Sequence, residues 1–221
     1  DAILPHFQAR IRAIEEIIRR EGIVSLPDRP MKFRVATEAE SVAQPAPHME
    51  PPRLIGNTGE IGEFVLPLRI PGSQGQGNLQ LDDFTYDAFS WPVTAHEGRP
   101  GHDLQFALLI EKGVSKARSI FAQNSVNVEG WALYAEAEVK PYLPLDGQLA
   151  TLQSRLARAA RALLDPGLQL GTVTRHRPGA VASTPKPRPI STSISRACAG
   201  RRACSSRSMS RIWAETSSDR Q

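Results

Sequence analysis

The sequence predicts a mainly α-helical protein with a small β element, followed by a basic tail without regular structure. Three observations support this prediction. Apolar residues recur at helical spacing in four segments, short β-like segments lie between prolines in residues 23–70, and all periodicity ends near residue 173. We therefore divide the chain into a core, residues 1–172, and a tail, residues 173–221.

The first expected helix covers residues 6–21, and Gly22 is a natural stop for it. Its apolar residues form a single stripe, which is typical of a helix packed on a protein surface: Phe7, Ile11, Ile14, Ile17 and Ile18. Six prolines in residues 23–55 exclude a long helix there. Short strands are expected at residues 32–35 and 63–68, and a Gly/Gln-rich exposed loop at residues 71–78.

Three further helices are expected in the second half of the core. They cover residues 104–112, residues 120–138, which Pro141 and Pro144 follow, and residues 145–164. The last of these carries leucines and alanines along one face, and we expect its arginines to form a solvated face.

The charge of the chain is divided unevenly between core and tail. The formal net charge is +4, and residues 173–221 carry nine Arg and one Lys against Glu215 and Asp219, which leaves −4 for residues 1–172. The core is therefore not expected to bind nucleic acid. No apolar run approaches the length of about 20 residues that a membrane-spanning helix needs. Both cysteines, Cys198 and Cys204, lie in the tail, so the core offers no cysteine ligand to a metal.

The first motif that carries chemistry is Thr94-Ala95-His96-Glu97-Gly98-Arg99-Pro100-Gly101-His102. Zinc peptidases commonly place two histidines at i and i+4 on a helix, with a glutamate beside the first as general base. Here the histidines are six residues apart, which places them about 120° apart on a regular helix. Pro100 and Gly101 can loop out and return His102 to the face of His96. Two unrelated surface histidines beside a turn are the alternative.

The second motif is Asn127-Val128-Glu129-Gly130-Trp131-Ala132-Leu133-Tyr134-Ala135-Glu136. Glu129 and Glu136 are seven residues apart and share one face of a helix. A zinc peptidase with two histidine ligands commonly takes a carboxylate as its third ligand and leaves the fourth position to water. The string Glu-Gly-Trp-Ala resembles the Glu-Gly-Phe-Ala of aminopeptidase N-like enzymes, whose glutamate binds zinc. The alternative is a solvated stripe of glutamates, which fits poorly beside Trp131 and the alanines.

Together the two motifs resemble the bacterial domain-of-unknown-function family 885, whose members are similar to zinc metallopeptidases of the gluzincin type. The resemblance covers residues 1–172 and implies a fragment from the middle of a longer protein, exported or lipoprotein in many members. It implies Zn²⁺ as cofactor, peptides as substrates, His96, His102 and Glu129 as zinc ligands and Glu97 as general base. For the mechanism we further expect Glu136 to hold the substrate amine or a ligand, and Tyr134 is a weaker candidate for stabilising the oxyanion. Asp103 departs from the family pattern, where a second His is usual, and so alters the surroundings of the ligands. Gly98 stands where Ala is usual.

The tail departs from the family altogether. Its Ser/Arg/Pro-rich composition is expected if a GC-rich gene is read out of frame, and the alternative is a disordered basic tail that binds acidic partners. Two other functions therefore stay open beside zinc-dependent peptide hydrolysis. One is an inactive fragment that retains the ligands, and the other is a scaffold whose tail carries the function.

Overall fold

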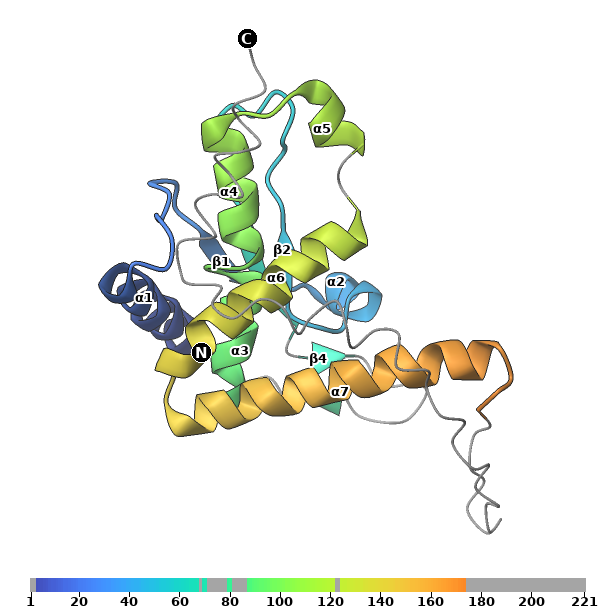
Figure 1. Ribbon diagram of the computed structural model, residues 1–221. Helices are drawn as coiled ribbons and strands as arrows, with labels where there is room; N and C mark the ends of the chain where they lie inside the picture. Colours follow the sequence, from blue (N-terminus) through green and yellow to red (C-terminus); the bar gives the residue numbers. More distant parts are fainter. Residues whose placement is uncertain (1–2, 68, 71–78, 81–86, 122–123, 174–221) are drawn as a thin grey trace, which may run out of the picture. The chain divides into compact units, whose positions relative to one another are not determined.

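A computed structural model describes residues 3–67, 69–70, 79–80, 87–121 and 124–173 (Figure 1). The expected loop at residues 71–78 and the tail from residue 174 onward lie outside the described residues. The chain divides into two compact units, Asp1–Ser154 and Arg155–Gln221. The candidate site lies entirely in the first unit.

The mainly α fold with a small β element is confirmed. The helices are α1 (Ile3–Glu21), α2 (Glu38–Ala43), α3 (Asp87–Glu97), α4 (His102–Lys112), α5 (Lys116–Phe121), α6 (Ser125–Val139), the 3₁₀ turn η1 (Lys140–Tyr142) and α7 (Leu145–Gln169). The strands are β1 (Lys32–Val35), β2 (His48–Glu50), β3 (Glu63–Leu66), β4 (Arg69–Ile70) and β5 (Leu79–Gln80). In the larger sheet, β3 is central, parallel to β1 and antiparallel to β2, and β4 and β5 form a separate antiparallel pair.

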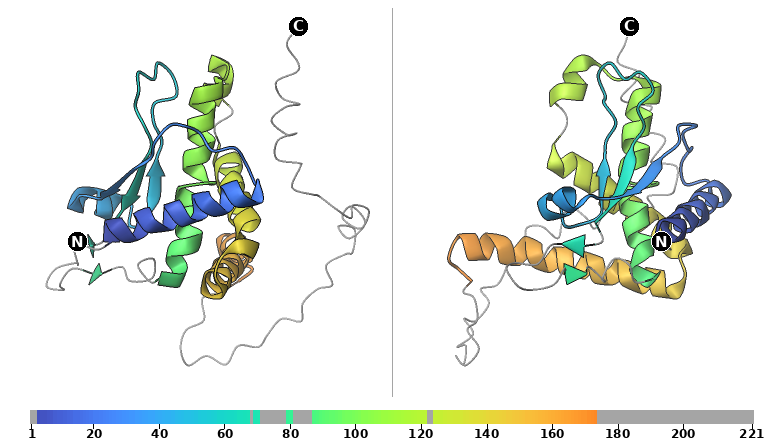
Figure 2. Two further views of the ribbon diagram at one scale, coloured as in Figure 1. Left: turned by 90° about the vertical axis from the view of Figure 1, so that its left-hand side faces the viewer. Right: turned by 180° about the vertical axis from the view of Figure 1, so that it is seen from behind.

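Helix α1 confirms the first sequence prediction, since all five residues of its apolar stripe are buried. Phe7 packs edge-on against Phe64 of β3, with ring centroids 5.6 Å apart, and Leu66 completes this part of the core. The helix runs across the sheet and also contacts α3 (Figure 2). It thereby joins the sheet to the helix that carries His96.

Several short elements were not expected from the sequence, among them α2 and β2. Helix α2 begins with a capping box, in which the Thr37 side chain accepts the Glu40 amide and the Glu40 carboxylate accepts the Thr37 amide. The edge strand β2 is three residues long, too short for a periodic signal. The helix expected over residues 120–138 is instead two helices, α5 and α6, and Asn124 caps the second by accepting the Asn127 amide.

Helix α7 is five residues longer than expected and continues through Pro166. Its arginines at 155 and 161 are exposed, as the sequence predicted. Its leucines are exposed as well, between 40% and 83%: Leu145, Leu149, Leu152, Leu156, Leu163, Leu164 and Leu168. Among the described residues, no helix combines the length and apolar content needed to cross a lipid bilayer.

Candidate metal centre

The first motif lies where two helices meet. Helix α3 ends at Glu97, α4 begins at His102, and residues 98–101 form the turn between them, with a cis peptide bond between Arg99 and Pro100. The Asp103 amide donates to the Gly98 carbonyl at 3.1 Å and closes this turn. As a result, the rings of His96 and His102 lie edge to face with centroids 4.8 Å apart. The sequence expectation of an interruption at Pro100 and Gly101 therefore agrees with the geometry.

Glycine is required at two positions of this turn. A Cβ at Gly101 would lie 1.8 Å from the His96 carbonyl oxygen and 2.5 Å from that of Ala95. A Cβ at Gly98 would lie 2.7 Å from the Thr94 carbonyl oxygen and 2.9 Å from Ile11 Cδ1. A side chain at Gly98 would therefore collide with the backbone of α3 and with Ile11 of α1. Gly101 allows the start of α4 to pass directly over the last carbonyls of α3.

The structure brings the three expected metal ligands together. One ligand atom each from His96, His102 and Glu129 lies within 4.8 Å of the others. Glu129 comes from α6, which contacts both α3 and α4 (Figure 1). Its carboxylate oxygens lie 3.3 Å from His96 Nε2 and 3.7 Å from His102 Nε2. Two ligands at about 2.1 Å from a tetrahedral zinc ion are about 3.4 Å apart, which is close to both glutamate–histidine distances. The ligand atoms, up to 4.8 Å apart without metal, would draw together around the ion.

Glu136 determines which ring nitrogen of His96 faces the place where the three ligand atoms meet. Its buried carboxylate lies 2.6 Å from His96 Nδ1. An ionised carboxylate only accepts hydrogen bonds, so Nδ1 donates and Nε2 is directed to the ligand group. Burial lowers the pKa of His96, but hydrogen bonds to Glu129 and Glu136 outweigh it and raise that pKa to about 9 in the metal-free protein. Of the two roles expected for Glu136, the geometry supports that of holding a ligand.

Glu97 lies beside the same point, with its carboxylate 3.9 Å from His96 Nε2. Burial raises the pKa of Glu97 to about 7, and the nearby positive His96 and a hydrogen bond from the Met49 backbone only partly oppose this increase. A carboxyl group with a pKa near neutrality can both take and return a proton, which is what a general base requires.

His102 and Asp103 are adjacent in sequence but lie in different environments. Burial, assisted by the positive charge of His96, lowers the pKa of His102 to about 4, so its ring is neutral at pH 7. Asp103 is turned toward Arg99, whose Nε donates to it at 2.8 Å. The same guanidinium donates to Glu15 of α1 and to the Arg29 carbonyl. Asp103 therefore supports the turn through Arg99 and is not among the residues that meet at the ligand group.

The sequence analysis did not assign roles to Arg99 and Trp131. Trp131 Nε1 donates to the carbonyl oxygens of both Pro100 and Gly101, at 3.0 Å each. Two features of the sequence could have drawn attention to them. Arg99 is a charged residue inside an otherwise buried turn, and Trp131 is an aromatic residue two positions after the expected ligand Glu129. Tyr134 follows Glu129 by five residues, a rotation of about 140° on a regular helix, and is 39% exposed.

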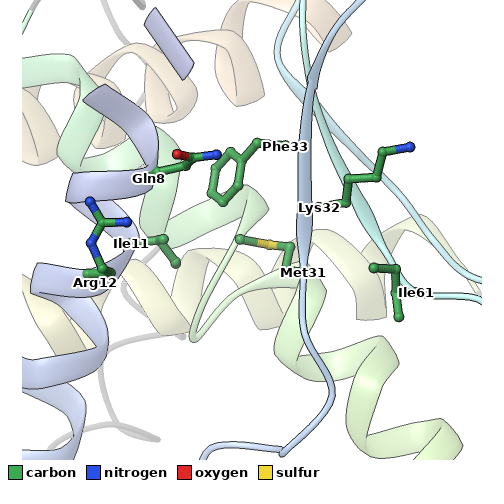
Figure 3. A pocket seen from close by; sticks show the side chains of 7 residues that line it. All are labelled: Gln8, Ile11, Arg12, Met31, Lys32, Phe33 and Ile61. Atoms are coloured by element: carbon green, nitrogen blue, oxygen red, sulfur yellow. The ribbon is translucent and has the colours of Figure 1, made fainter. Parts of the chain in front are cut away.

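A groove of about 600 Å³ lies between α1 and β1, outside the metal centre (Figure 3). It is lined by Gln8, Ile11, Arg12, Met31, Lys32, Phe33 and Ile61. None of the residues assigned to the metal centre lines this groove, although Ile11 and Met31 lie against Gly98.

The fold and site define a mainly α protein in which α3 and α4 supply two histidines, and α6 one glutamate, to a single group. The chain belongs to the family described as bacterial protein of unknown function (DUF885), which matches residues 1–184. This match ends beyond residue 173, where the sequence analysis placed the start of the tail.

Comparison with solved structures gives a match to a candidate lipoprotein from Colwellia psychrerythraea. The TM-score is 0.56 and the sequence identity is 23%, over 75% of this chain. The match establishes a shared fold. It covers 27% of the other protein, so this chain corresponds to about a quarter of that length. No curated protein matches the chain.

Proposed function

We propose that this chain carries the zinc-binding core of a metallopeptidase, with His96, His102 and Glu129 as the ligands. The observation that carries this proposal is the convergence of their ligand atoms within 4.8 Å of one another. Neutral imidazole nitrogens and a carboxylate form a common ligand set of catalytic zinc. The buried carboxylate of Glu136 on His96 Nδ1 supports the same assignment, because histidine ligands usually donate their other N–H to such a partner.

Each residue around this ligand group has its own role in the proposed hydrolysis of a peptide bond. Held by His96, His102 and Glu129, zinc would supply Lewis-acid polarisation of the scissile carbonyl and would lower the pKa of a bound water to about 7. Glu97, whose carboxylate lies 3.9 Å from His96 Nε2, takes the proton of the attacking water and delivers it to the leaving amine. Glu136 holds His96 in the tautomer that directs Nε2 toward the ligand group. The oxyanion role considered for Tyr134 is not included, because α6 turns it away from Glu129.

Hydrolysis is proposed for the longer parent protein. The chain matches about a quarter of the Colwellia psychrerythraea protein, so much of a substrate cleft would come from other segments. Export of the parent is part of the proposal, in line with the description of that relative as a candidate lipoprotein.

Metal content tests the central claim directly. The purified chain, loaded with zinc and dialysed, should retain one zinc per chain by mass spectrometry. In competition with a chromogenic chelator, His102→Ala should weaken zinc binding by more than about 100-fold, since it removes a ligand and not only an outer-shell partner. His6→Ala is the control, because His6 is a histidine that lies away from the ligand group, on α1, and pairs with Asp87. Equal zinc binding by the two variants would refute the assignment.

A further inference from the structure

The turn at residues 98–101 determines whether the two histidines can share a metal. On an unbroken helix their side chains would be about 120° apart. The backbone hydrogen bonds of the turn join it to its own two helices: Gly98 to Thr94, Asp103 to Gly98 and Gln105 to Gly101. These bonds close the turn but do not fix its position relative to α6, which brings the third ligand.

Besides the Glu129 carboxylate, two contacts connect α6 to the residues at the two histidine ligands, and Gln105 of α4 also donates to Asn127 of α6 at 3.3 Å. Glu136, at the C-terminal end of α6, binds His96 Nδ1 at 2.6 Å and so ties the helix to the end of α3. Trp131 binds the Pro100 and Gly101 carbonyl oxygens at 3.0 Å each and so ties it to the residues that lead directly into His102. The two contacts therefore hold opposite sides of the ligand group.

The opposite side of the turn is already fixed. The Arg99 guanidinium donates to Asp103 of α4, Glu15 of α1 and the Arg29 carbonyl, and its side chain is 7% exposed. The turn is thus held to α1 by Arg99 and to α6 by Trp131. The indole thus links the position of the turn to the helix of Glu129.

We propose that Trp131 is a positioning residue of the metal centre. Its indole N–H holds the Pro100–Gly101 carbonyls against α6, and this fixes the distance between His102 and Glu129. The proposal rests on the proposed function, because it assumes that these residues bind a metal. A metal site tolerates errors of about 0.2 Å in its ligand distances. A small displacement of the turn from α6 would therefore weaken binding without unfolding the protein.

The test compares two Trp→Phe substitutions. Trp131→Phe keeps an aromatic ring on α6 and removes the donor to both carbonyls. Trp91→Phe is the control: Trp91 lies on α3, is more deeply buried at 6% exposure, and stacks against the Arg10 guanidinium. Trp131→Phe should weaken zinc binding about tenfold, the lower end of the effect of outer-shell substitutions. Trp91→Phe should change it less than about twofold, although it should lower the melting temperature at least as much.

The visible spectrum of the Co²⁺-loaded protein gives a readout that a packing role alone would not change. Trp131→Phe should alter the intensity and position of its d–d bands, and Trp91→Phe should leave them unchanged. In the wild-type chain, exchange of the Trp131 indole N–H with solvent should be slow and should become slower when zinc binds, because coupling between two sites is reciprocal. This exchange measurement uses the wild-type chain, so it tests the proposal even if Trp131→Phe does not fold.

Each result decides the proposal. Unchanged zinc affinity and spectrum in Trp131→Phe, equal losses in both variants, or an indole N–H that exchanges as fast as free indole would overturn the positioning role while leaving the metal centre intact. A wild-type chain that binds no zinc would refute the metal centre and the positioning role with it. A selective loss in Trp131→Phe supports both.

Discussion

Replacement of Gly101 by alanine tests whether the close passage of α4 over α3 is essential for the ligand group. The new Cβ would lie 1.8 Å from the His96 carbonyl oxygen and 2.5 Å from the Ala95 carbonyl oxygen. Both obstructing atoms belong to the backbone, so no side-chain rotation relieves the contact.

The size of the effect follows from this geometry. Overpacking of a protein interior typically costs about 1–3 kcal/mol. Because only the backbone can move here, we expect the upper limit of about 3 kcal/mol. The reduced entropy of the unfolded alanine variant offsets about 0.4–1 kcal/mol of this. For a chain of this size, a net loss of about 2 kcal/mol lowers the melting temperature by about 4–8 °C.

Gly130→Ala is the matched control. Gly130 lies in α6 beside Glu129, and nothing lies within 4 Å of its added Cβ. Alanine is favoured over glycine inside a helix by about 0.8–1.0 kcal/mol, so the melting temperature should rise by a few degrees and zinc affinity should not change. Differential scanning calorimetry and chelator competition measure both quantities. A Gly101→Ala protein with wild-type stability and zinc affinity would refute the role given to this turn.

Three further predictions concern the ligand group. Zinc binding should strengthen about tenfold per pH unit between about pH 6 and 8, because the pKa of His96 is about 9 without metal and binding must displace its proton. A dissociation constant that does not change with pH over this range would contradict the pairing of His96 with Glu129 and Glu136. Glu136→Gln should flatten that pH dependence, since the pKa of His96 falls without the neighbouring charge, and should weaken zinc binding about 10–100-fold above pH 9, as chelator competition can measure. In the full-length parent, Glu97→Gln should retain zinc and lose about 10²-fold or more of peptide turnover. Near-normal turnover of the zinc-loaded variant would exclude Glu97 as general base, and zinc loss would make it a ligand.

The periodic spacing of apolar residues was sufficient to predict the elements that pack one face against the core. The stripe of α1 was identified completely, because each of its five residues faces the same interior. Helix α2 has six residues and strand β2 has three, and no period can be recognised over so few positions. The capping box at Thr37 and Glu40 was a local signal that could have located α2.

The candidate site was predictable to the extent that its chemistry is local in sequence. Two motifs identified His96, His102 and Glu129, since each motif contains its own ligands. Apart from Asp103, the partners of Arg99 and Trp131 are 30 to 84 positions away in the chain. Only the folded structure brings such partners together. The direction of the Asp103 side chain likewise depends on the position of Arg99, and sequence spacing alone does not determine it.

The placement of Glu129, Trp131 and Glu136 on α6 restricts how the gene can change in length. One residue inserted or deleted between Glu129 and Glu136 would rotate the second glutamate by about 100° relative to the first and remove it from His96. The connection between Lys112 and Ser125 is under no such constraint, because none of its described residues belongs to the ligand group. Homologous chains should therefore differ in length at residues 113–124, while the spacings within residues 96–102 and 129–136 stay fixed.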